Sequence, residues 1–413
     1  MTRVGYLPHD PAAVSVEAGW LGDRLAVPVE VIDLATAADA LRGSAAGRGL
    51  GDTLGCVAGL RAVVAEGIKG FAAATRLRRA GFTGLLVLLP YVNPLRWADV
   101  ATITAYLAVA DPRDRVFVGS AASAAVFAAF GVSATVAEPF GIDDELYRPR
   151  PGHHRVRRAL GLGPGRILLY AGRAQPDKDL YRLLRVGLRA RLLFADLQVV
   201  LATHVDDEAY LAVARAELGE GDGVAFVHPT RAQLADLYAE SDVFVTASTS
   251  GFETFGRAPV EALACGTPAV APRYAGFPEV LDQPGGRLAD LSLDGTAAPH
   301  VSEEHLLRAV YDVLSSPAPP SPDLVSATAR RRFGRSRTLA CLDYLTGGPL
   351  PPVAHVQPPE LDLPPAVERD RVASDDPDPD AADALLAVAV RRALCPRPVP
   401  GRSTATQEVG WCR

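Results

Sequence analysis

Short runs of apolar, mostly β-branched residues alternate along this chain with segments in which apolar residues recur at helical spacing. In the first half the apolar runs predict strands at residues 3–8, 29–34, 61–66, 85–90, 115–120 and 134–139. After a segment rich in Pro, Gly and Arg (148–165), further runs follow at 166–172, 197–204, 224–229, 242–248 and 268–274. Strands that alternate with helices are typical of parallel βαβ units with both sheet faces covered. We therefore expect an α/β protein with two tandem doubly wound domains.

The domain limits follow from changes in composition. We place a first domain at 1–150 and a second at 151–346, whose final helix we expect to pack back on the first domain. From about residue 347 the chain becomes Pro-rich and acidic, with one helix predicted near 381–394. This tail (347–413) lacks the apolar surface to fold alone. It is either mobile or draped on the body.

Composition narrows the choice of partners. The formal charge is −6 over 413 residues, which argues against a nucleic-acid binder because such proteins carry basic patches. The chain has no apolar run long enough for a membrane span, and its first residues lack the features of a signal peptide. Five cysteines are scattered singly, without metal-ligand spacing. We expect a cytoplasmic protein with a small-molecule partner and without a metal site.

Two cations follow the first strand of the second half. In "YAGRAQPDKDL" (170–180), Gly172 forms a turn, Arg173 comes next and Lys178 opens the following helix. In parallel sheets ligands bind outside the carboxyl ends of the strands, and helix N-termini favour anions. Only two of the 42 basic residues are lysines, Lys69 and Lys178, so chance placement of Lys178 at this position is improbable. The stretch predicts a phosphate site, and the alternative is a surface Arg and Lys that flank a turn.

Two glutamates occur eight positions apart in "GFETFGRAPVEALACG" (251–266). Glu253 precedes a predicted helix, and Glu261 lies one to two turns inside it; the helix ends at Gly266, a suitable C-cap residue. A carboxylate can accept hydrogen bonds from two hydroxyls, as the diols of ribose and hexoses require. The spacing by itself is equally compatible with coincidence.

The residues around the two glutamates carry a more specific signal. The pattern E-x-F-G-x-x-x-x-E-A-L-A-C-G-T-P, followed by "AGFPEVL", resembles the signature of retaining glycosyltransferases of family 4, which have the two-domain GT-B architecture. "VFVGSAASAAVFAAFGV", "PFGIDDELYRP", "YAGRAQPDK" and "LADLYAESDVFVTAS" also occur in the order and spacing of that family. The resemblance covers most of residues 115–345, whereas the first hundred residues match in layout only.

The resemblance implies roles for individual residues. Arg173 and Lys178 would neutralise a nucleoside diphosphate, Glu261 would bind the ribose hydroxyls, and Glu253 would contact the donor sugar. The second domain would take a nucleoside-diphosphate sugar and the first domain an acceptor, with no metal or other cofactor. Retention is attributed to front-face attack assisted by the departing phosphate, so Glu253 is not expected to act as a nucleophile of the kind found in glycosidases. Further donor contacts would come from Gly172, Thr254, Phe255, Gly256, Gly276 and Phe277.

The chain departs from the family pattern at several positions. No paired glycines follow the first strand, Asp179 and Ala275 stand where glycine is common, and the loop "PYVNP" offers Asn93 where a histidine is common. On the acceptor side we consider Lys69, which follows a predicted strand, together with Asn93 and, as weaker candidates, His9 and Asp10.

Other functions stay open at this stage. Three arginines on the helix 70–82 (Arg76, Arg78 and Arg79) could form a basic face for a membrane-bound, lipid-linked acceptor, or only a solvated face. A non-catalytic nucleotide-sugar binder is a second alternative, and an epimerase on the same architecture is a third. The arginine, alanine and proline bias suggests a GC-rich bacterial source and, by association, secondary-metabolite glycosylation. The sequence leaves open the nucleotide (UDP, GDP, ADP or dTDP), the sugar, the acceptor and the oligomeric state.

Overall fold

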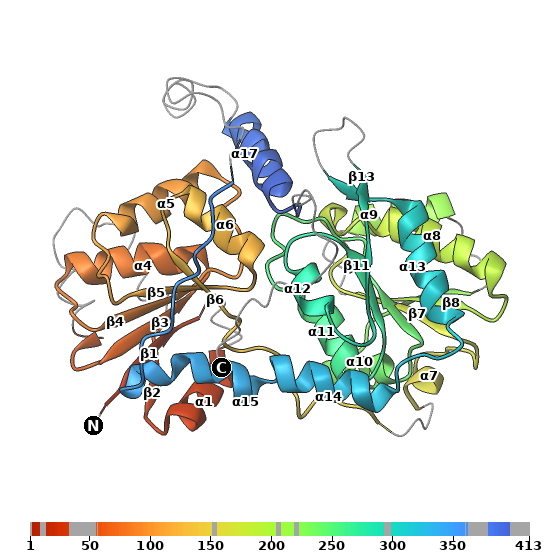
Figure 1. Ribbon diagram of the computed structural model, residues 1–413, viewed down its shortest axis with the longest axis horizontal. Helices are drawn as coiled ribbons and strands as arrows, with labels where there is room; N and C mark the ends of the chain where they lie inside the picture. The colour runs from red at the N-terminus through yellow and green to blue at the C-terminus, as the bar shows by residue number, and fades with distance from the viewer. Residues whose placement is uncertain are drawn as a thin grey trace. The chain divides into compact units, whose positions relative to one another are not determined.

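The computed structural model describes residues 2–8, 14–32, 55, 57–150, 155–203, 208–218, 223–292, 299–359, 361 and 379–396. The chain forms two compact units (Figure 1). Unit 1 comprises Met1–Phe140 together with Thr338–Arg413, and unit 2 comprises Gly141–Arg337.

Unit 1 is built on a parallel sheet of six strands. Their order is β2-β1-β3-β4-β5-β6, so the direction of winding reverses between β1 and β3. Each predicted strand of the first half is present, although most are shorter than the apolar run that predicted them. The strands are β1 (Val4–Leu7), β2 (Val29–Val31), β3 (Ala62–Glu66), β4 (Leu85–Leu89), β5 (Arg115–Val118) and β6 (Ala134–Val136).

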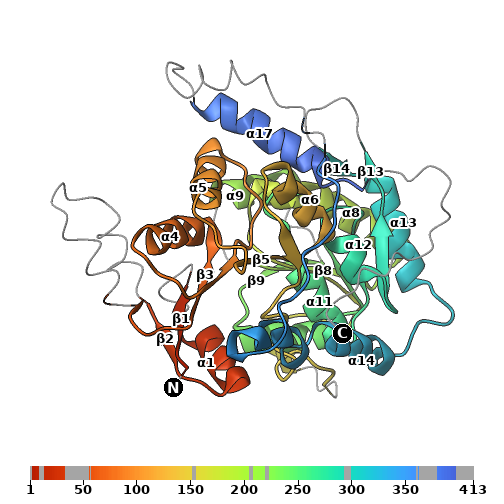
Figure 2. The same ribbon diagram turned by 60° about the vertical axis from the view of Figure 1, so that its left-hand side comes forward.

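Helices cover both faces of this sheet (Figure 2). In β3, Val63 and Ala65 pack against one set of helices, whereas Ala62 and Val64 pack against the other. This explains the continuous apolar run, because a strand covered on both faces has no polar side. One face carries α4 (Gly67–Arg79), α5 (Trp97–Leu107) and α6 (Ala121–Ala129), and the other carries α1 (Val14–Leu25) and the 3-10 helix η3 (Leu339–Thr346).

Unit 2 is built on a second parallel sheet of six strands, in the order β12-β11-β10-β7-β8-β9. Winding reverses between β7 and β10, which are neighbours in the sheet. The five strands predicted for this half are present. The strands are β7 (Ile167–Ala171), β8 (Gln198–Ala202), β9 (Val224–Val227), β10 (Val243–Val245), β11 (Ala269–Pro272) and β12 (Gly286–Ala289), with a separate pair β13 (Leu291–Ser292) and β14 (His300–Val301).

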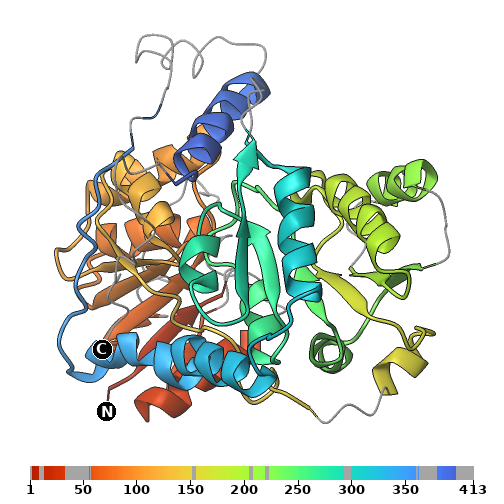
Figure 3. The same ribbon diagram turned by 45° about the vertical axis from the view of Figure 1, so that its right-hand side comes forward.

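The sheet of unit 2 also lies between two layers of helices (Figure 3). One layer contains α8 (Leu180–Leu193), α9 (Glu208–Leu218) and α13 (Glu303–Leu314). The other contains α10 (Arg231–Ala239), α11 (Arg257–Ala264), α12 (Phe277–Leu281) and α14 (Pro322–Phe333), with α7 (Arg155–Ala159) beside α10. Two doubly wound α/β units, expected from the sequence, are thereby confirmed.

The structure divides the units at different residues from those placed by composition. The segment 141–150 belongs to unit 2, because the Ile142 amide donates to the Phe333 carbonyl (3.0 Å) and the Arg335 amide donates to the Ile142 carbonyl (3.0 Å). The short helix α15 (Arg335–Thr338) then leads into η3, which packs on α1 in unit 1. Composition shows where a chain is polar, whereas these contacts join residues far apart in sequence.

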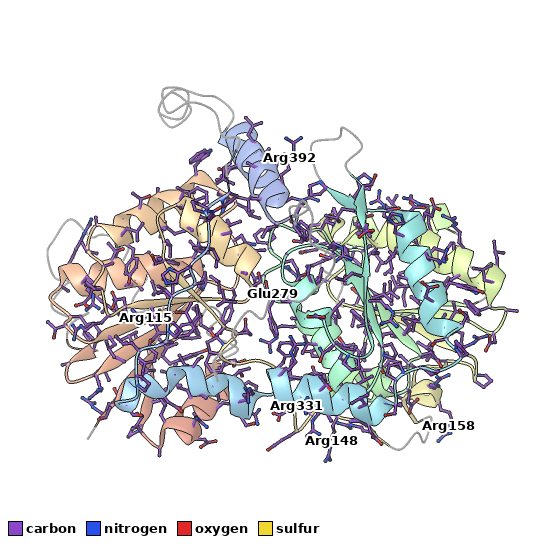
Figure 4. All side chains as sticks on the ribbon, viewed as in Figure 1. Arg115, Arg148, Arg158, Glu279, Arg331 and Arg392 are labelled. Carbon is purple, nitrogen blue, oxygen red and sulfur yellow. The ribbon has the colours of Figure 1, made fainter. Side chains whose placement is uncertain are left out.

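The described part of the tail is draped on unit 1. Arg115, labelled in Figure 4, donates to the Pro351 carbonyl (3.0 Å), and the Ala354 amide donates to the carbonyl of Ala134 in β6 (2.7 Å). The predicted tail helix is present as α17 (Pro379–Ala393), which packs on α5 and α6. Its Asp383 carboxylate accepts from the first amide of α5, that of Trp97 (2.8 Å). The sequence left open whether the tail is mobile or draped on the body, and these residues are draped on unit 1.

Candidate functional site

The reversal point of the unit 2 sheet brings two loops together. The loop after β7 carries Arg173 and Lys178, and the loop after β10 carries Glu253. In a doubly wound sheet the carboxyl ends of the two strands at such a point flank the usual ligand crevice. The predicted phosphate residues and the first predicted carboxylate are therefore on adjacent loops of one unit.

Direct contacts link these loops. The Lys178 ammonium lies 3.4 Å from the Glu253 carboxylate and 3.4 Å from the Ser248 hydroxyl, and both charged side chains are 16% exposed. One residue earlier, the Asp177 carboxylate accepts from the Ser250 hydroxyl. Lys178 is thus held at the junction of the two loops, while Arg173 is exposed at the end of β7.

The helix that follows Lys178 differs from expectation. Lys178 ends a 3-10 turn, η2 (Pro176–Lys178), and Asp179 caps α8 by accepting from the Arg182 amide (3.3 Å). The Asp179 carboxylate also pairs with the Arg182 guanidinium. An acidic cap occupies the N-terminal amide that it reaches and disfavours a further anion there. The α8 N-terminus, which the sequence suggested for the phosphate, is already capped.

The N-terminus of α11 differs from that of α8 in its N-cap residue. Its N-cap is Gly256, which adopts a left-handed conformation (φ 98°) and has no side chain to form a cap hydrogen bond. The first amides of a helix carry partial positive charge and favour anions when no cap satisfies them. The α11 terminus directly follows the Glu253 loop and, unlike that of α8, has no acidic N-cap residue.

The loop after β11 packs against the backbone that leads into the start of α11. Gly276 packs so closely that a Cβ placed on it would lie 2.5 Å from the Thr254 carbonyl oxygen and 2.8 Å from that of Phe255. The rings of Phe255 and Phe277 are buried, and the Phe277 amide donates to the Tyr274 carbonyl (3.1 Å). The neighbouring Ala275 adopts φ 48° and Asp179 adopts φ 50°. Both positions at which the chain lacks a family glycine therefore do have the left-handed backbone that glycine favours.

Glu261 lies within α11, half-buried, as the sequence predicted. The Tyr238 hydroxyl donates to its carboxylate (3.3 Å). Burial raises the pKa of Glu261, and the charges of Arg257 and Arg231 and the hydrogen bonds of Tyr238 and Tyr147 oppose this effect. Sequence reasoning missed the two tyrosines, since they come from segments distant in the chain.

Of the acceptor-side candidates in unit 1, the structure describes Lys69 and Asn93. Lys69 is exposed in the first turn of α4, directly after β3 at the reversal point of that sheet. Asn93 is fully buried. His9 and Asp10 lie outside the described residues. Their roles toward an acceptor stay predictions.

A buried polar cluster near β3 was not singled out from the sequence. The hydroxyls of Tyr6 and Tyr91 both contact the Glu66 carboxylate, the latter at 2.9 Å. Tyr91 has φ 56°, an unusual conformation for a bulky residue and one that a surrounding structure must enforce. The position of Glu66 at the end of a predicted strand was the available signal.

The three arginines of α4 do not share one solvated face. Arg78 pairs with Asp114, and these side chains are only 8% and 4% exposed. Arg78 also donates to the carbonyls of Phe82 and Gly84. It therefore serves the interior of unit 1, which leaves Arg76 and Arg79 for any basic face. Among the helices that the structure describes, none has the length and apolar character needed to span a membrane.

Comparison with known proteins relates the sequence of unit 2 to a family model. Residues 155–332 match the family model of Glycosyl transferases group 1, so unit 2 carries the sequence pattern of that family. A similar relative is D-inositol 3-phosphate glycosyltransferase 2 of Catenulispora acidiphila, 37% identical over 149 residues. The alignment covers 33% of this chain and 34% of that relative; this chain thus matches well under two thirds of the relative's length.

Solved structures extend the similarity to the whole fold. HepE of Anabaena, crystallised in complex with UDP and glucose, has a TM-score of 0.63 at 17% identity, covering 83% of this chain and 98% of its own. Sucrose-phosphate synthase from Thermosynechococcus elongatus has a TM-score of 0.59 at 19% identity, with 84% and 96% covered. These similarities confirm the expected fold, two Rossmann-like units of the GT-B type.

Proposed function

We propose that the protein is a retaining glycosyltransferase that transfers a sugar from a nucleoside diphosphate to a small hydroxylated acceptor without a metal ion. The observation that carries this proposal is the ion pair of Lys178 with Glu253 on the loop that leads into the glycine-capped start of α11, with Glu261 on the same helix. Cations and helix amides suit a diphosphate, and a half-buried carboxylate suits a diol. The family match over residues 155–332 supports this reading.

The chemistry follows from where charge develops. As the anomeric C–O bond breaks, its electron pair goes to the diphosphate and the sugar becomes oxocarbenium-like. Fixed cations and helix amides stabilise the growing negative charge more than they stabilise the intact donor. Arg173, Lys178 and the first amides of α11 would supply this stabilisation.

Glu253 is assigned to holding the sugar. Its pairing with Lys178 places the Glu253 carboxylate next to a cation proposed to bind the diphosphate, where the carboxylate can accept hydrogen bonds from sugar hydroxyls. In the front-face mechanism the acceptor oxygen attacks from the side of the leaving group, and its proton passes to the departing phosphate. The reaction then balances without a protein nucleophile.

The comparisons bear on the substrates as follows. The relatives are named D-inositol 3-phosphate glycosyltransferases, and HepE was crystallised with UDP and glucose. A nucleoside-diphosphate sugar donor and a small polyhydroxylated acceptor are consistent with both. We further propose a cytoplasmic location and, from the arginine, alanine and proline bias of the sequence, a role in secondary metabolism.

A lipid-linked acceptor is a weaker candidate because Arg78 is committed to its buried ion pair. Co-sedimentation with anionic liposomes at low and high salt tests it: salt-sensitive binding would favour the membrane alternative. A non-catalytic binder would be excluded by hydrolysis of the donor without acceptor. An epimerase would convert the donor sugar without any acceptor and release little diphosphate.

A thermal-shift panel of UDP, GDP, ADP and dTDP tests the diphosphate site. One nucleotide should stabilise the wild type by about 2.7 kcal/mol at a concentration of 100 times its Kd. The double variant Arg173→Ala, Lys178→Ala should lose this shift. Arg189→Ala is the matched control, since Arg189 is a half-exposed cation farther along α8. Equal shifts in the wild type and the double variant would overturn the proposal.

A further inference from the structure

Two tyrosines converge on the Glu261 carboxylate from different segments. Tyr238, in α10, donates its hydroxyl to Glu261 (3.3 Å). Tyr147, in the segment 141–150, packs edge-to-face on Tyr238 and, as a hydrogen-bond donor to Glu261, opposes the rise in the pKa of that carboxyl. Neither tyrosine belongs to the loops that carry Arg173, Lys178 and Glu253.

The two rings are fixed by packing. Their centroids lie 6.0 Å apart with an interplanar angle of 72°, an edge-to-face arrangement, and Tyr238 also packs on Phe244 at 5.9 Å. Tyr147 is 3% exposed and Tyr238 is fully buried. Buried aromatic rings in such a pair have little rotational freedom, so the positions of their hydroxyls are set in advance.

The backbone around each ring is anchored as well. The Tyr238 carbonyl accepts from the hydroxyl of Thr267, which lies just beyond the end of α11. Tyr147 closes a turn in which its amide donates to the Asp143 carbonyl (2.8 Å). The Asp143 carboxylate in turn pairs with Arg335 (3.3 Å) and Arg231 (3.6 Å). The tyrosines are thus parts of a rigid frame around α11.

The charge balance identifies the tyrosines as donors. Burial raises the pKa of both phenols, so each stays protonated and can donate a hydrogen bond to the carboxylate. Arg257 and Arg231 favour the charged form of Glu261, against the effect of its burial. The result is a carboxylate with a defined orientation and with acceptor capacity left for further donors.

We propose that Tyr147 and Tyr238 are positioning residues that hold Glu261 for a ribose diol and thereby make unit 2 selective for ribonucleoside over 2′-deoxyribonucleoside diphosphates. This inference rests on the proposed function, which it narrows to ribonucleotide donors such as those of UDP, GDP or ADP and away from dTDP. A 2′-deoxyribose would leave one acceptor position of an oriented, partly buried carboxylate without a donor. Such a loss disfavours the analogue more than the mere absence of a contact does.

The test is a ratio of dissociation constants measured by calorimetry with matched nucleotide pairs: UDP and dUDP, GDP and dGDP, ADP and dADP. For the pair that binds, the wild type should prefer the ribonucleotide by about 10- to 100-fold. Tyr147→Phe and Tyr238→Phe should each reduce this preference several-fold. The Kd of the 2′-deoxynucleotide should stay unchanged, because only the hold on the diol is altered.

Two controls separate positioning from stability. Tyr181→Phe removes a tyrosine hydroxyl from α8 that donates to the Tyr210 carbonyl (3.5 Å), and it should keep the wild-type preference. Glu261→Ala should lose the preference completely and marks the lower limit. Thermal melting of each variant reports whether the unit is folded, and a variant that fails to fold is replaced by the other single tyrosine variant.

The outcomes are distinct. Equal weakening of both nucleotides in the tyrosine variants would show a structural role only and would overturn the inference, as would an unchanged preference. A wild type that binds a ribonucleotide and its 2′-deoxy analogue equally would overturn the inference while leaving the proposed function intact. A wild type that binds none of the six nucleotides would overturn both.

Discussion

Replacement of Gly276 by alanine perturbs the packing of the β11 loop against the backbone that leads into α11. A Cβ at this position would lie 2.5 Å from the Thr254 carbonyl oxygen and 2.8 Å from that of Phe255. Gly276 itself has φ −80°, a conformation that alanine adopts freely. The effect of the substitution is therefore steric and acts on the backbone that leads into the Gly256 cap.

The size of the steric effect follows from how far the Cβ–oxygen distances fall below van der Waals contact. Ordinary van der Waals contact begins at 3.4 Å, so one of the two backbones must move by about 1 Å, a displacement that can cost about 100-fold in a catalytic rate. Overpacking of this kind also costs about 1–3 kcal/mol of stability. We expect Gly276→Ala to weaken diphosphate binding at least about tenfold and to lower the free energy of unfolding of unit 2 by about 1–3 kcal/mol.

Urea denaturation and calorimetric titration with the diphosphate measure the two effects. Gly163→Ala is the matched control in the same unit, because its Cβ would meet only the amide end of the Gln198 side chain, at 3.4 Å. The control should bind the diphosphate as the wild type does. If Gly276→Ala kept both wild-type affinity and wild-type stability, the packing argument for the α11 terminus would be wrong.

Three further predictions concern charged residues. Glu253→Gln should keep or improve diphosphate affinity, because it releases Lys178 from its ion pair, yet lower turnover; unchanged turnover in a kinetic assay would remove Glu253 from the sugar site. Diphosphate affinity should fall as pH is lowered, since burial raises the pKa of Glu261 and the protonated acid accepts fewer hydrogen bonds. Glu261→Gln should lose the pH dependence that comes from the carboxyl and keep only that from protonation of the phosphate, at about pH 6. Identical pH profiles of affinity for the wild type and Glu261→Gln, measured by calorimetry, would contradict this. Arg78→Ala should destabilise unit 1 by about 3–5 kcal/mol, because it leaves a buried carboxylate without its cation, whereas the exposed Arg79→Ala should be neutral in urea denaturation.

The fold of both units could be predicted from the alternation of apolar runs, since a strand covered on both faces must be apolar along its whole length. The strand β12 could not, because Gly286 and the exposed Arg287 interrupt its apolar pattern. Such an edge strand is defined by its pairing with β11, which local sequence does not specify. The unit boundary at residue 140 likewise depends on hydrogen bonds between segments far apart in the chain.

Some residues of the candidate site could likewise be predicted from the sequence and others could not. Glu253, Glu261 and Lys178 were recognisable because each belongs to a local motif at a strand end or helix start. The tyrosines at Glu261 were not, because hydrophobic spacing explains a tyrosine in α10 without any contact of its hydroxyl. The capped start of α8 could have been anticipated, since Asp179 is a strong N-cap residue, and its acidic charge disfavours an anion there.

The most direct test of the central claim is a crystal structure of the protein with the nucleoside diphosphate that gives the largest thermal shift. The account predicts the diphosphate between Arg173, Lys178 and the first amides of α11, with the ribose hydroxyls on Glu261. A diphosphate bound in unit 2 away from the β7 and β10 loops, or a ribose that does not contact Glu261, would contradict it.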